Sequence, residues 1–122
     1  MKTKNLFVSF FLLTVIACNN ETGKPVAVDG PVANNTVCMV NNKYMAKTQI
    51  PVPVNNKTYY GCCEACVVKL KEDAASRYAT DPVSGDSVDK ADASIIVKPG
   101  STDDVLYFKS PQGAREYLAN MK

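Results

Sequence analysis

Apolar and polar positions recur in two successive cycles along the second part of the chain. The first cycle predicts three short extended segments, at residues 36–40, 43–47 and 52–60. A turn at Asn55-Asn56 makes the last of them a hairpin. Apolar residues then recur at helical spacing from Cys63 to about Thr80, where Asp81-Pro82 ends the helix. The first cycle is therefore a hairpin followed by a helix.

The second cycle has the same order of segments. It predicts a hairpin and a helix, at residues 94–98, 105–108 and 111–121. Ser110 is a suitable N-cap and Pro111 suits the first helical position. Because neither strand–strand–helix unit could bury its apolar face alone, we expect the two to pack as one small α+β domain.

The two cycles align as a degenerate internal repeat with a period of about 47 residues. The alignment sets a cysteine-bearing half, residues 36–80, against a cysteine-less half, residues 81–122. Three cysteines have other residues as counterparts, with Cys38 opposite Ser84, Cys62 opposite Lys109, and Cys66 opposite Gly113. Thiol chemistry therefore belongs to the first half.

The chain begins with an apolar run, residues 6–17, preceded by Lys2 and Lys4. The run is too short to cross a hydrocarbon core that takes roughly 20 apolar residues, so we interpret residues 1–17 as a cleaved export signal. Ala17 directly before Cys18 resembles the recognition sequence of the bacterial lipoprotein-processing peptidase. The resemblance implies that Cys18 carries lipid and becomes the first residue of the mature protein.

Residues 18–35 are polar, contain glycine and proline, and lack helical or strand periodicity, which is typical of a tether. Acyl chains on Cys18 would supply the membrane affinity. These features predict a lipid-anchored protein of the bacterial cell envelope. Asn19, directly after the lipidated cysteine, favours the outer membrane over the inner membrane.

Charge and composition exclude several classes of function. Removal of the signal reduces the 14 basic residues to 12, equal to the 12 acidic residues, so nothing draws the mature protein to nucleic acid. The chain contains no histidine, which excludes Ser/His and Cys/His catalysis and removes the commonest zinc ligand. We therefore predict a monomeric binding protein rather than an enzyme.

Four cysteines of the mature domain form the candidate site. Cys38 lies in an early strand, and the others, Cys62, Cys63 and Cys66, lie where the hairpin meets the helix. Residues three or four apart on a helix are neighbours, so Cys66 can point the same way as Cys62 or Cys63. Backbone N–H groups at a helix start lower a thiol pKa and favour the thiolate, the form that binds metals. Two of these sulfurs with Cys38 would make a three-sulfur site.

Three motifs of this half resemble the TRASH and YHS domains, small treble-clef-like modules of heavy-metal trafficking, sensing and resistance. The motifs are Val37-Cys38-Met39, the aromatic pair Tyr59-Tyr60, and Cys62-x3-Cys66 followed by Leu70. The resemblance implies a treble-clef-like half that carries the metal site. In architecture alone, the paired units are also similar to NosL-type copper-delivery lipoproteins.

Sulfur ligands without imidazole select soft ions such as copper(I), mercury(II) or zinc(II). Three thiolates, with the thioether of Met39 or Met45 nearby, suit a two- or three-coordinate copper(I) ion. Four thiolates, including Cys63, suit a tetrahedral zinc. We expect one ion, copper(I) in preference to zinc, bound for trafficking, sequestration or resistance and exchanged with a protein donor or acceptor.

Two other interpretations remain open. Four cysteines outside the cytoplasm could form a disulfide framework for an interaction protein without metal, although adjacent Cys62 and Cys63 would join only with strain. Alternatively, Cys63-x-x-Cys66 at a helix start is the arrangement of thiol redox proteins. Those proteins carry a βαβ unit, whereas this sequence predicts hairpins.

Overall fold

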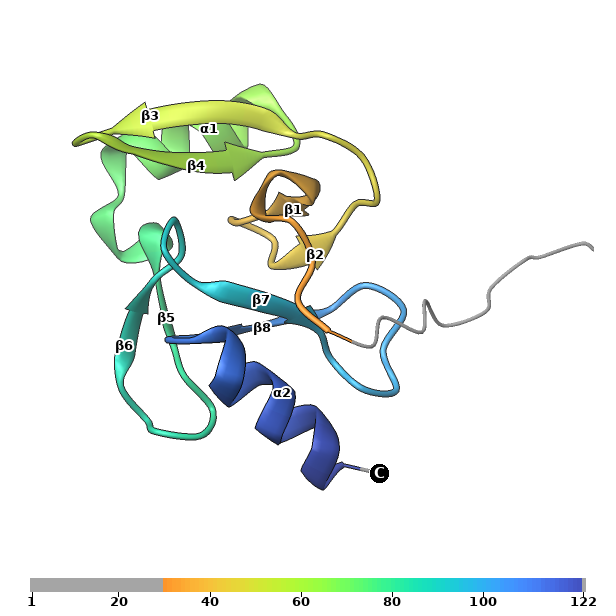
Figure 1. Cartoon of the computed structure of the whole chain (residues 1–122). Helices are drawn as coiled ribbons and strands as arrows, with labels where there is room; N and C mark the ends of the chain where they lie inside the picture. Colours follow the sequence, from red (N-terminus) through yellow and green to blue (C-terminus); the bar gives the residue numbers. More distant parts are fainter. Residues whose placement is uncertain (1–29, 122) are drawn as a thin grey trace, which may run out of the picture.

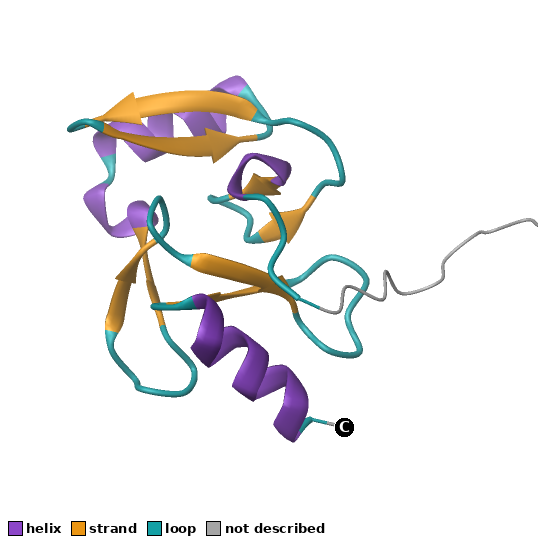
Figure 2. Cartoon of the chain, viewed as in Figure 1, coloured by secondary structure: helices purple, strands orange, loops and turns teal. Residues whose placement is uncertain are grey.

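The computed structural model describes residues 30–121 as two series of short strands, each followed by a helix (Figures 1 and 2). The first series comprises β1 (Val37–Cys38), β2 (Lys43–Tyr44), β3 (Ile50–Val54), β4 (Lys57–Gly61) and α1 (Glu64–Glu72). The second comprises β5 (Tyr78–Thr80), β6 (Ser87–Asp89), β7 (Ser94–Val97), β8 (Val105–Phe108) and α2 (Pro111–Asn120). A short 3-10 helix precedes each series: η1 (Asn34–Thr36) lies before β1, and η2 (Ala74–Arg77) lies before β5. The α+β class is confirmed.

The strands pair as four separate antiparallel hairpins, β1–β2, β3–β4, β5–β6 and β7–β8. The β3–β4 hairpin turns at Asn55 and Asn56, whose φ angles are 51° and 65°. Asparagine tolerates the left-handed conformation that a tight hairpin turn requires. At the last helix, the Ser110 hydroxyl accepts the Gly113 N–H at 3.0 Å, and Pro111 occupies the first turn. These predicted elements are confirmed.

Helix α1 ends earlier than the apolar pattern predicted. It stops at Glu72, and the Asp73 carboxylate accepts a backbone N–H of the following 3-10 turn at 3.1 Å. The Arg77 guanidinium donates to the carbonyl of Leu70 at 2.8 Å, near the end of the helix. The predicted continuation to about Thr80 was wrong, because these side-chain hydrogen bonds stabilise a turn in place of further helix.

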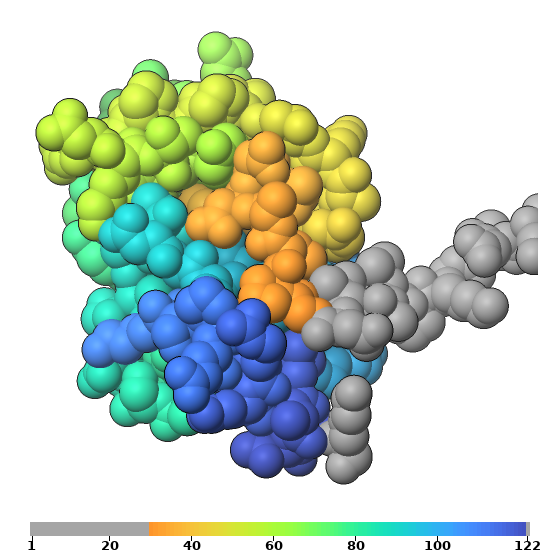
Figure 3. All heavy atoms as spheres, viewed as in Figure 1, coloured from red at the N-terminus to blue at the C-terminus, as the bar shows by residue number. Residues whose placement is uncertain are grey.

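One hydrophobic core joins the two halves. Its buried residues come from both series: Val37, Met39, Val52, Tyr59, Leu70, Val88, Ala93, Ile95, Val105 and Tyr107. Helix α1 packs on the β3–β4 hairpin, and a smaller cluster of Ile96, Phe108 and Ala114 holds α2 against β7 and β8. Figure 3 shows the first half, from orange to green, in direct contact with the second, from cyan to blue. The prediction of one packed body is confirmed.

The folded body begins before β1. The Val32 N–H donates to the Ile95 carbonyl of β7 at 2.7 Å, and the Asn34 side-chain amide donates to the Ala93 carbonyl at 3.2 Å. Val32 and Asn34, which lie in the predicted tether, are thus hydrogen bonded to the cysteine-less half.

The export signal and Cys18 lie outside the described residues. Within the part of the chain that the structure describes, no helix has the length and apolar character needed to cross a membrane.

Candidate metal centre

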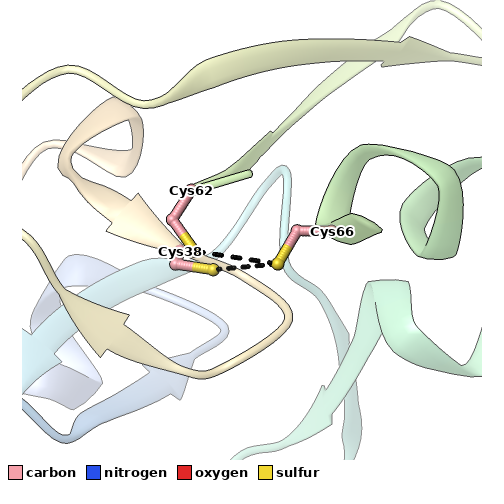
Figure 4. A group of neighbouring side chains, drawn as sticks. All are labelled: Cys38, Cys62 and Cys66. Atoms are coloured by element: carbon pink, nitrogen blue, oxygen red, sulfur yellow. Dashed lines mark hydrogen bonds between the residues drawn. The ribbon is translucent and has the colours of Figure 1, made fainter. Parts of the chain in front are cut away.

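Three cysteines meet where the β1–β2 hairpin, the end of β4 and the start of α1 come together (Figure 4). Cys38 ends β1, Cys62 directly follows β4, and Cys66 lies in the first turn of α1. Their Sγ atoms all lie within 4.8 Å of one another. The Sγ of Cys66 is 3.8 Å from that of Cys38 and 3.7 Å from that of Cys62.

These separations suit sulfurs that share one ion. With metal–sulfur bonds of about 2.3 Å, the sulfurs of a tetrahedral or trigonal site stand about 3.8–4.0 Å apart. All four cysteines of the described chain are free thiols. Cys38 and Cys66 are buried and Cys62 is half-buried, so the cluster lies at the edge of the core.

A surface cleft of about 400 Å³ reaches the cluster at Cys62. The side chains of Met45, Ile50 and Pro51 contribute to its lining. Met45 therefore lines the same cleft as Cys62, whereas Met39, the other methionine near the cysteines in sequence, is fully buried in the core. The cleft gives an ion or a partner a route to Cys62.

Cys63 occupies a different position from the other three cysteines. It is the N-cap residue of α1 and is exposed, and its Sγ lies 3.3 Å from that of Cys66. It does not belong to the group of three sulfurs that lie within 4.8 Å of one another. Cys62, rather than Cys63, is therefore the residue that joins Cys38 and Cys66.

Gly61 explains how α1 comes so close to the end of β4. A Cβ atom at this position would stand 2.9 Å from the Cβ of Cys66, a distance at which something must shift. The absent side chain therefore lets the first turn of α1 place Cys66 beside Cys62. Sequence reasoning missed this role, although a glycine directly before a candidate ligand was an available signal.

The environments of the three sulfurs shift their pKa values in different directions. Burial tends to raise the pKa of Cys38, but the backbone N–H groups of Asn41 and Val40 help to outweigh it, so this pKa is lowered. The pKa of Cys62 is raised, chiefly by its hydrogen bond with the Cys38 sulfur. Burial raises the pKa of Cys66 to about 12. Metal binding must therefore displace protons from Cys62 and Cys66.

The cysteine-less half has a carboxylate where the first half has Cys38. Asp81 directly follows β5 and accepts the N–H groups of Val83 at 2.8 Å and Ser84 at 3.2 Å. Its other oxygen accepts the N–H of Lys109 at 2.9 Å, and Lys109 follows β8 as Cys62 follows β4. The predicted pairing of Cys38 with Ser84 was wrong, because the β1–β2 and β5–β6 turns differ in length.

This comparison supports the lowered pKa of Cys38. The groups that stabilise negative charge on the Cys38 sulfur include the backbone N–H groups of Val40 and Asn41, two and three residues after it, and that of Cys62. The three corresponding N–H groups, those of Val83, Ser84 and Lys109, donate to the Asp81 carboxylate. They outweigh its burial and lower the pKa of that carboxyl. At the other two positions of the second half, the Lys109 ammonium pairs with Asp86 at 2.7 Å, and Gly113 has no side chain. Among the described residues, the cysteine cluster that could hold an ion therefore belongs to the first half.

The chain matches no protein-family model, no curated protein and no solved structure. The geometry of the described residues is therefore the basis on which a function is inferred.

Proposed function

We propose that this protein is a lipid-anchored, soft-metal-binding protein of the bacterial cell envelope that holds one ion through Cys38, Cys62 and Cys66. The observation that carries the proposal is the convergence of three Sγ atoms from three different elements within 4.8 Å. The absence of histidine and the motifs that resemble TRASH and YHS domains support it. Lipid on Cys18 would supply the anchor.

Copper(I) is the ion that this arrangement suits best. It is soft and accepts three sulfur ligands, whereas a closed structural zinc site needs four protein ligands. Cys63, which would be the fourth thiolate, stands outside the group of three. An incomplete ligand shell beside a cleft favours trafficking, because a partner's ligand can approach the ion before a cysteine leaves it.

The test is a copper(I) titration of the full chain, purified in reduced form in detergent, against a calibrated chelator. The wild type should bind one ion. Each of Cys38→Ser, Cys62→Ser and Cys66→Ser should weaken binding by more than about 100-fold, since loss of an outer-shell partner alone can cost 10–100-fold. Cys63→Ser is the matched control, because it removes a neighbouring thiol while its hydroxyl keeps a donor beside the Cys66 sulfur, so the affinity should fall by about tenfold or less.

Binding should also release protons and weaken as the pH falls, because two of the thiols are protonated beforehand. Unchanged affinity in both Cys38→Ser and Cys66→Ser would contradict the proposal. So would a wild-type protein that is isolated with two disulfides and takes up no metal after reduction.

A second candidate function, thiol–disulfide exchange, is favoured by the 3.3 Å separation of the Cys63 and Cys66 sulfurs. Cys63 is exposed, and its pKa is lowered chiefly by the backbone N–H of Cys66. In this reaction the Cys63 thiolate would attack a substrate disulfide, which is reduced while Cys63 and Cys66 are oxidised. Such activity would be lost in Cys63→Ser and kept in Cys38→Ser, the opposite of the metal-binding pattern.

A further inference from the structure

A buried lysine of the cysteine-less half reaches the loop that follows Cys38. Lys90, directly after β6, is 4% exposed. Its Nζ donates to the Met39 carbonyl at 2.7 Å and to the Asn42 Oδ1 at 3.0 Å. The same atom lies 5.2 Å from the centre of the Tyr107 ring. All of these partners are neutral, and none of the ion pairs among the described residues includes Lys90.

Burying an ammonium group without a carboxylate is costly, and neutral hydrogen-bond acceptors offset only part of that cost. Burial lowers the pKa of Lys90 to about 8, while negative charge on Cys38 acts in the opposite direction. Met39 directly follows Cys38, so the hydrogen bond to the Met39 carbonyl holds the ammonium at the residue next to the first ligand of the site.

A second residue of the cysteine-less half, Tyr107, also holds the loop that contacts the Lys90 ammonium. The Tyr107 hydroxyl donates to the Asn42 Oδ1 at 2.9 Å, the same oxygen that accepts from Lys90. Asn42 itself adopts a left-handed conformation, with a φ of 54°, which asparagine tolerates. The position of the charge is therefore determined by the fold and not by a mobile surface side chain.

We propose that Lys90 is the counter-ion of the three-sulfur site and biases it toward a monovalent ion. The inference rests on the proposed function, because it concerns the ion that the site holds. Three thiolates around copper(I) leave two negative charges, whereas around zinc(II) they leave one. A fixed ammonium therefore stabilises the copper(I) complex more, by its interaction with one additional charge. Lys90 is thus a specificity-determining residue that does not contact the ion.

The test compares copper(I) and zinc(II) affinities of the reduced full chain by chelator competition. Lys90→Met and Lys90→Gln remove the charge, and the glutamine keeps a donor for the Met39 carbonyl. Both variants should lose copper(I) affinity on the order of tenfold more than zinc(II) affinity. Lys71→Met is the matched control, because it removes the same charge from an exposed position on α1. It should leave the ratio of the two affinities unchanged.

The ratio of affinities separates an electrostatic role from a structural one, since general loosening of the site would weaken both metals. The shift should also persist at high salt, because ions screen a buried pair poorly. A folded Lys90→Gln variant with the wild-type ratio would overturn the inference, and so would loss of the fold in both neutral variants. A wild type that binds neither metal would instead refute the proposed function.

Discussion

At the scale of single residues, the candidate site depends on groups that are not ligands. Gly61 allows the first turn of α1 to approach β4, and the Asn41 side-chain amide lies 3.5 Å from the Cys62 sulfur, toward which it donates. Groups of this kind orient metal ligands and stabilise the charge that the ligands carry. Their substitution should therefore change metal binding while every sulfur remains in place.

Gly61→Ala tests this dependence directly. The new Cβ would stand 2.9 Å from the Cβ of Cys66, so α1 must move away from β4. We expect a loss of about 1–3 kcal/mol in the free energy of unfolding, typical of overpacking, together with weaker copper(I) binding. Gly30→Ala is the control, because nothing lies within 4 Å of its added Cβ. Equal stability and affinity in the two variants would show that the close approach has no role.

At the scale of elements, the sequence predicted best where the signal is local. Asn55-Asn56 specified one turn, and Ser110-Pro111 specified the start of α2, because each acts through its own backbone. The early end of α1 and the β5–β6 hairpin were not predicted. The turn between β5 and β6 depends on Asp81, which also binds the end of a strand distant in sequence.

The candidate site was likewise predictable only where the signal is local. The spacing of the cysteines indicated which sulfurs could meet, but the choice of Cys62 over Cys63 depends on how closely α1 lies against β4. Lys90 had no signal at all, because a lysine in a turn is ordinarily solvated and its burial follows only from the packing of the two halves.

The correspondence of the two series predicts that the second half can be converted into a metal site. A variant with Asp81→Cys, Lys109→Cys and Gly113→Cys should bind a second copper(I) ion, because its three sulfurs would occupy the positions that Cys38, Cys62 and Cys66 have in the first half. The added Cβ at Gly113 would meet the Ser110 Oγ at 3.3 Å, a contact that requires the hydroxyl to give by a few tenths of an ångström. The number of ions bound per chain checks the prediction.

The matched control for this variant replaces Asp81→Cys with Ser84→Cys, which follows the simple sequence alignment. It carries the same number of thiols but should bind only the original ion. Equal stoichiometry in the two triple variants would argue against the structural correspondence of Asp81 and Cys38.

At the scale of the whole molecule, the apolar core extends well beyond the three cysteines of the candidate site. The core that joins the halves consists of aliphatic and aromatic side chains with one methionine, and the three sulfurs lie at its edge. Small metal-dependent modules unfold without their ion because they lack such a core. Here the second half supplies buried surface that the first half alone would lack.

Removal of copper(I) by a strong chelator should therefore leave the protein folded. We expect the far-ultraviolet circular dichroism to be preserved and thermal unfolding to stay cooperative, with a lower Tm because bound metal stabilises only the native state. Loss of the dichroism signal on addition of chelator, reversed by metal, would show instead that the ion is needed for folding.

The hydrogen bonds before β1 have a mechanical consequence. Tension applied through the segment that precedes residue 30 would reach the domain first at Val32, which is bonded to Ile95 of β7, and then at Asn34, which is bonded to Ala93. Both bonds transfer the load to the half without cysteines. A pull from the lipid anchor proposed at Cys18 would thus be borne by these two hydrogen bonds, and β1 with Cys38 would stay unloaded until both had broken.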